Sequence, residues 1–99
     1  MTKTAIIFQK ITKLSNLIAG MTRVCTIIEP VAAHEIRVAI SETKVTLHTI
    51  DLLINKLHTK YGKEYKNMPE EEYHDIIDKL DTAYARCINI RFPYENTIM

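Results

Sequence analysis

Two ladders of residues at heptad spacing, one on each side of Pro30, constrain the fold of this chain most. The ladder before Pro30 is apolar at every step: Ile7, Ile11, Leu14, Ile18, Met21, Cys25 and Ile28. The ladder after it has one polar member among Ala33, Ile36, Ile40, Thr43, Leu47, Ile50, Ile54, Leu57 and Tyr61. Alternating steps of three and four place residues on one stripe of a helix, as packing against another helix requires. The chain is therefore expected to fold mainly as long amphipathic helices.

The predicted fold class is all-α, with three long helices over about residues 4–28, 31–61 and 69–91. Pro30 and Gly62 mark the ends of the second helix, because proline suits a first helical turn and glycine a C-cap. We expect an antiparallel helical bundle in one domain spanning residues 1–99. A chain of 99 residues is near the lower size limit for a self-supporting core, so oligomerisation could complete this bundle. The third helix should bury Tyr73, Ile76, Ile77, Leu80, Ala83, Tyr84, Cys87 and Ile88.

The alternative fold is α+β, with a small antiparallel sheet between residues 22 and 48. About half of the residues in this segment are β-branched, which favours strands, and apolar and other residues alternate around Val38 and Val45. The turns that such a sheet needs contain neither Gly nor Asn, which argues against it.

A second apolar series recurs every seven residues on the opposite side of the predicted second helix. We call it the outer stripe, and its members are Val31, Val38, Val45 and Leu52. The simplest interpretation is a central helix packed on both faces by the other two helices of the chain. The strand alternative would also account for it. The third interpretation is an exposed stripe that binds a second copy or another protein.

Charge is divided unevenly along a chain whose net charge is only +1. Residues 1–28 contain no acidic residue and have a candidate basic face made of Lys3, Lys10, Lys13 and Arg23. Residues 62–81 contain seven acidic residues and three lysines. The favoured explanation is attraction between the first and third helices, within a chain or across a dimer. Nucleic-acid binding through the basic face is the less favoured alternative, since four charges along a long helix are a weak footprint.

The candidates for chemistry are sparse, so the protein is predicted not to be an enzyme and to need no cofactor. Glu72, Asp75 and Asp78 form one acidic row of the kind that helical Mg²⁺-dependent hydrolases use, but no facing row is recognisable. The single Glu-x-x-His pattern, at Glu71 and His74, lacks the second copy that a di-iron bundle needs. The two cysteines sit at apolar positions and are read as buried thiols.

The sequence alone favours a small helical interaction protein, of regulator or inhibitor type, that binds another macromolecule and forms a dimer or higher oligomer. No run approaches the roughly 18 apolar residues of a membrane span, and no signal peptide is recognisable, so a cytoplasmic location is expected. The chain is rich in Ile and Lys and poor in Gly and Ala, a composition common in proteins from AT-rich bacterial, phage or viral genomes, and a phage, viral or bacterial accessory protein is a plausible instance of this function. Nucleic-acid or nucleotide-ligand binding is the second functional hypothesis, and a metal-dependent hydrolase is the third.

Overall fold

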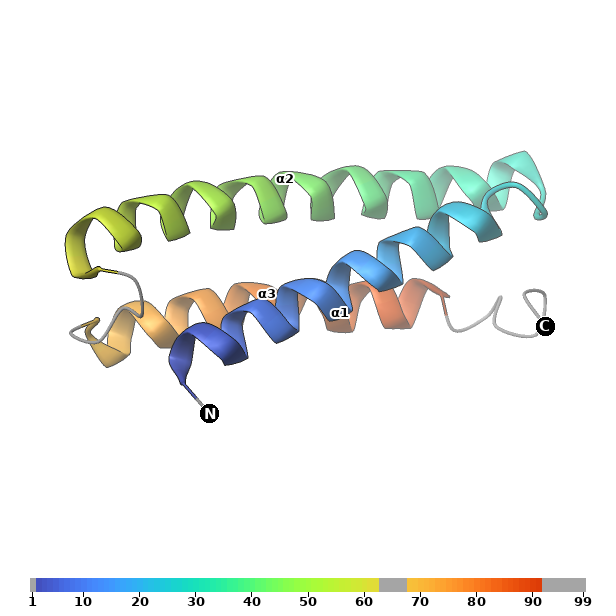
Figure 1. The fold of residues 1–99 in the computed structure, drawn as a ribbon. Coiled ribbons are helices and arrows are strands. Elements are labelled where there is room, and N and C mark those ends of the chain that lie inside the picture. Colours follow the sequence, from blue (N-terminus) through green and yellow to red (C-terminus); the bar gives the residue numbers. More distant parts are fainter. Residues whose placement is uncertain (1, 63–67, 92–99) are drawn as a thin grey trace.

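The structure is a computed structural model that describes residues 2–62 and 68–91. These residues form three helices: α1 (Lys3–Val24), α2 (Pro30–Tyr61) and α3 (Glu70–Arg91). In Figure 1, α2 extends along the molecule, α1 and α3 lie on the same side of it, and α2 runs antiparallel to both. The all-α prediction is confirmed. Within the described residues there is no strand, so the alternative sheet between residues 22 and 48 is wrong.

Local sequence explains where the helices begin and end. The Thr2 hydroxyl accepts a hydrogen bond from the Ala5 N–H (3.1 Å), which caps the start of α1. Pro30 occupies the first turn of α2, where its missing N–H costs nothing. Gly62 ends α2 with φ of 82°, a left-handed conformation that glycine adopts without steric cost. The three glutamates 70–72 start α3 at the positive end of its dipole.

α1 ends at Val24, four residues earlier than the pattern predicts. The Thr26 and Ile27 N–H groups donate to the carbonyls of Arg23 and Val24 (3.1 and 3.0 Å), which makes a tighter turn after the helix. Glu29 is extended, with ψ of 144°, as expected before a proline. The chain therefore uses residues 25–29 to reverse direction, and periodicity alone does not reveal that requirement.

Two apolar clusters fill the space between the helices. One joins α1 to the first half of α2 and takes a single buried residue from the described part of α3, Cys87. The other takes buried residues from all three helices and from the segment before α3: Ile7, Leu14, Ile50, Ile54, Leu57, Met68, Ile76 and Leu80. Leu47 packs against both clusters. Tyr84, which the pattern predicts to point inward, is instead exposed, because it lies at the edge of the contact between α1 and α3, in a hollow that Lys10 and Lys13 also line.

Candidate interaction surface

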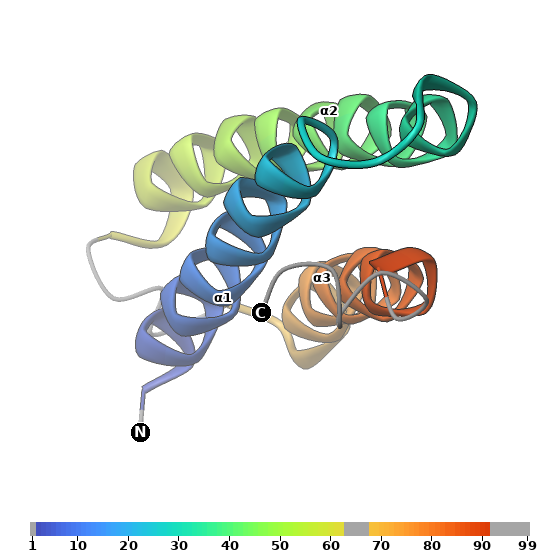
Figure 2. The ribbon, with the colours of Figure 1, turned by 90° about the vertical axis from the view of Figure 1, so that its right-hand side faces the viewer.

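The outer stripe lies on the side of α2 that faces away from α1 and α3. Val31 is 85% exposed, Val45 66%, Leu52 51% and Val38 38%. Figure 2, which looks along the bundle, shows α1 and α3 both on the opposite side of α2. The prediction that the other two helices cover both faces of α2 is therefore wrong, because both pack against the longer inner ladder. Of the three interpretations, only the exposed stripe fits the structure.

A groove runs between α2 and α3 next to the outer stripe. Its volume is about 520 Å³, and Val45 contributes to it as well as to the stripe. Its walls combine charged, hydroxyl and apolar side chains: Glu42, Thr43, Val45, Thr46 and Thr49 from α2, and Asp78, Lys79, Thr82, Ala83 and Arg86 from α3. The groove and the stripe thus form one continuous candidate surface for recognition.

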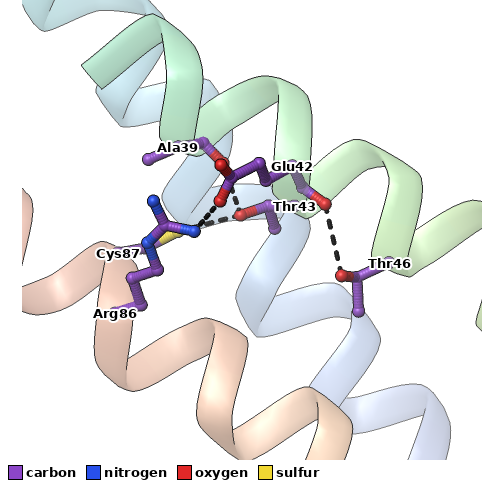
Figure 3. A network of polar contacts seen from close by, with 6 residues as sticks. All are labelled: Ala39, Glu42, Thr43, Thr46, Arg86 and Cys87. Atoms are coloured by element: carbon purple, nitrogen blue, oxygen red, sulfur yellow. Dashed lines mark hydrogen bonds and ion pairs between the residues drawn. The ribbon is translucent and has the colours of Figure 1, made fainter. Parts of the chain in front are cut away.

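A small polar network joins α2 to α3 along this groove (Figure 3). Arg86 forms an ion pair with Glu42, and both side chains are about half exposed. Deeper, the buried Thr43 hydroxyl lies 2.7 Å from the Ala39 carbonyl oxygen and 3.2 Å from the Cys87 Sγ. Since the hydroxyl donates its proton to the carbonyl, the Cys87 thiol is the donor in the second contact. The network attaches α3 at the end of the bundle where, among the described residues, Cys87 is the one fully buried core residue of α3.

The hydroxyl groups of the threonines that α2 contributes to the groove are already engaged in hydrogen bonds within α2. The hydroxyls of Thr43, Thr46 and Thr49 each donate to the carbonyl four residues earlier in α2, at 2.7, 3.2 and 3.0 Å. A hydroxyl engaged in this way has less hydrogen-bonding capacity left for a ligand. The groove therefore suits a partner that packs apolar atoms against Val45 and Ala83 and places charges near Asp78, Lys79 and Arg86.

The candidate basic face is divided between intramolecular ion pairs and solvent. The Lys3 ammonium lies 2.5 Å from Glu70 Oε1, and the Lys10 ammonium lies 2.7 Å from Asp81 Oδ1. These pairs confirm the predicted attraction between the first and third helices, although the sequence did not identify the partners. Lys13 and Arg23 are exposed and form no ion pair within the described residues. Two of the four residues of the predicted basic face are thus paired with carboxylates of α3, and the other two have no carboxylate partner among the described residues.

The Lys3 ion pair also affects an acidic residue at the start of α3. Glu70 accepts a hydrogen bond from the Lys3 ammonium, and this contact holds the pKa of the Glu70 carboxyl below its ordinary value. Lys3 also lies 5.4 Å from the centre of the Tyr73 ring, within the range of a cation–π contact. These contacts attach the N-terminus of α1 to the first turns of α3.

The acidic row of α3 is dispersed rather than gathered into a metal site. Asp75 forms an ion pair with Lys79 of the same helix, and Asp78 lines the groove. One oxygen of Glu72, Oε2, is buried without a hydrogen-bond partner in the described part of the chain. Over residues 2–62 and 68–91, no three His, Cys, Asp or Glu side chains come together in a way that could hold a metal ion. The hydrolase hypothesis therefore gains no support from this arrangement.

The two cysteines are buried and are not joined in a disulfide. This agrees with the reading of Cys25 and Cys87 as thiols at apolar positions. The Cys25 Sγ lies 3.8 Å from the Ala33 carbonyl oxygen, and Cys87 contacts Thr43. Each thiol thus has a local hydrogen-bond partner, which satisfies a polar group inside the core.

Sequence reasoning missed the groove and its polar network. One signal was present: Thr43 is the single polar residue in the ladder of α2, and a buried hydroxyl needs a partner. Nothing in the periodicity of α3 indicates that Cys87 supplies that partner, or that Arg86 reaches Glu42. Both contacts depend on how α3 docks against α2.

No helix in the described part of the chain is both long and apolar enough to cross a membrane. Comparison of the chain with protein-family models, with curated proteins and with solved structures finds no match.

Proposed function

We propose that this protein is a non-catalytic helical interaction protein that binds another macromolecule through the outer stripe of α2 and the adjoining groove. The observation that carries this proposal is the exposure of four apolar residues at heptad spacing on one helix face: Val31, Val38, Val45 and Leu52. An apolar stripe edged by polar residues is typical of a protein-interaction site. A regulator or inhibitor acting in the cytoplasm fits this proposal.

The groove supports the same function through its shape and composition. It lies between two antiparallel helices and has charged residues at its edge, such as Asp78 and Arg86, with apolar Val45 in its wall. An amphipathic helix that lies in such a groove buries apolar side chains and pairs its charges at the rim. We therefore expect the partner to present a helical or similarly elongated apolar surface.

Nucleic-acid binding remains the second candidate because Lys13 and Arg23 are exposed and without ion pairs in the described residues. It is less well supported, since Lys3 and Lys10 are engaged with carboxylates of α3. Two remaining cations on one helix give a small electrostatic contribution to phosphate binding.

The proposed function is tested by placing a photo-crosslinking amino acid at Val45 and irradiating cells of the organism that encodes the protein. The expected result is a covalent adduct of defined mass whose protein component can be identified by mass spectrometry. The matched control carries the same crosslinker at Ser15, an exposed residue of α1. Equal crosslinking at both positions, or no adduct at Val45, would contradict the proposal.

A further inference from the structure

We propose that the outer stripe of α2 pairs with the same stripe of a second copy of this chain, with the two α2 helices antiparallel. This inference rests on the proposed function, because it assigns an occupant to the same surface. In Figure 1 neither of the other two helices covers the side of α2 that faces away from α1 and α3. A helix from a second copy therefore has access to the whole stripe.

The apolar residues of the two stripes lie close to one another when two copies meet in this way. From Val31 to Leu52 the stripe extends roughly 32 Å along the helix at 1.5 Å per residue. A twofold axis between Val45 and His48 brings the two Val45 residues close together and places Val38 near the partner's Leu52. A twofold-symmetric contact of this kind is self-complementary, which is how most homodimers associate.

The charges that border the stripe give the strongest reason to choose a second copy as the occupant. On one side the antiparallel arrangement places Lys44 near the partner's Asp51, and on the other it places Glu35 near the partner's Lys56. The symmetry repeats each pair, so both pairs form twice. None of these residues has an ion pair within the described chain. The stripe is thus bordered by unpaired charges that complement those of an identical surface.

Fewer of the charged residues that border the stripe form ion pairs when the two helices are parallel. Asp51 would still meet the partner's Lys56 in that arrangement. Lys44, however, would face the partner's Thr49, and Glu35 would have no cation opposite it. The antiparallel arrangement pairs all of these charges, whereas the parallel one leaves a lysine and a glutamate without a partner.

A parallel pair would also compete with a contact that exists within each chain. It would place Arg37 near the partner's Glu42, a carboxylate that already forms an ion pair with Arg86. Gaining the new contact would therefore weaken the polar network that joins α2 to α3. The antiparallel arrangement uses charges that are free in the described chain and leaves the Glu42–Arg86 pair intact.

The test uses two charge-reversal variants and their mixture, followed by sedimentation velocity over a range of concentrations. Wild type should form a dimer. Lys44→Glu and Asp51→Lys should each weaken self-association by about tenfold or more, because each turns two attractive pairs into repulsive ones. The equimolar mixture should recover a dimer containing one chain of each kind. In that dimer the introduced glutamate of one chain meets the introduced lysine of the other, and the remaining native Lys44 meets the native Asp51. Lys13→Glu, a matched charge change on α1, should self-associate as wild type does.

Three outcomes would overturn the inference. The first is a wild type that stays monomeric at about 100 µM, where even a weak specific dimer is populated. The second is a Lys44→Glu variant that associates as strongly as wild type, which would fit a parallel pair. The third is a mixture that associates no better than its components. If wild type is monomeric but the Val45 crosslinker still captures a different protein, the proposed function stands and only the second copy is excluded.

Discussion

The inner and outer faces of α2 bear apolar residues at regular heptad intervals, yet they have opposite environments. On the inner face Ile36 is 1% exposed and Ile50 is fully buried. On the outer face Val45, five residues before Ile50, is 66% exposed. The difference arises because α1 and α3 both pack on the inner side (Figure 2). A heptad pattern therefore shows that residues share a stripe, and the neighbouring elements decide whether that stripe becomes core or surface.

The comparison extends to the polar residues on the two faces. Thr43 belongs to the inner ladder, is 4% exposed and bonds to groups of both α2 and α3. Thr49 lies near the outer stripe, is exposed and bonds to its own helix. The same residue type thus has a tertiary role on one face and a local role on the other.

The largest expected effect is the contrast between truncations on the two faces. Ile50→Ala should lower the free energy of unfolding by about 2–5 kcal/mol, because it leaves a cavity in the core. Val45→Ala should change it by no more than roughly 0.5 kcal/mol at low protein concentration, since the side chain is mainly in water. Urea unfolding of both variants measures this difference. A large cost for Val45→Ala even in dilute protein would break the comparison between the faces.

The second test concerns the buried polar contact between α2 and α3. Thr43→Val keeps the side-chain shape but removes the hydroxyl to which the Cys87 thiol donates, and should cost about 1 kcal/mol of stability. Thr46→Val is the matched control, because its hydroxyl bonds only to the Glu42 carbonyl within α2 and its loss should cost less. Thermal unfolding followed by circular dichroism measures both. Equal losses of stability in the two variants would show that the contact between Thr43 and Cys87 does not stabilise the protein.

A smaller effect is expected from the exposed ion pair that joins Lys10 of α1 to Asp81 of α3. A double-mutant cycle of Lys10→Ala and Asp81→Ala should give a coupling energy of about 0.2–1 kcal/mol that decreases with added salt. The same cycle with Lys13 in place of Lys10 should give none, because Lys13 forms no ion pair in the described structure. Chemical unfolding at two salt concentrations provides the data. A coupling energy that is the same for Lys10 and Lys13, and that does not change with salt, would contradict an ion pair between Lys10 and Asp81.

The smallest effect concerns pH. Because the hydrogen bond from Lys3 lowers the pKa of Glu70, the ionised carboxylate stabilises the folded state. That contribution is fully present above the unfolded-state pKa of about 4.3 and is lost as pH falls through the lower folded-state value. Glu70→Gln should therefore be less stable than wild type near neutral pH, and the difference should vanish in acid. A stability difference that persists unchanged in acid would exclude this ion pair as its cause.

Much of the architecture follows from the sequence because it is set by local chemistry. The heptad ladders predict the helices, Pro30 and Gly62 bound α2, and the glutamates 70–72 mark the start of α3. The end of α1 is less predictable, because the number of residues needed to reverse the chain depends on how α1 packs against α2. The attraction between α1 and α3 is predictable from net charge, but its pairs, such as Lys10 with Asp81, depend on helix register.

The sequence by itself determined that α2 has two apolar faces and that positive and negative charge separate into different helices. These are properties of spacing along a regular helix, which residue order specifies. Tertiary structure alone decided which face is buried, where the groove lies and that Cys87 meets Thr43. The physical reason is that burial depends on which surfaces of distant segments come together. One helix pattern is compatible with several such packings until the other helices occupy one side.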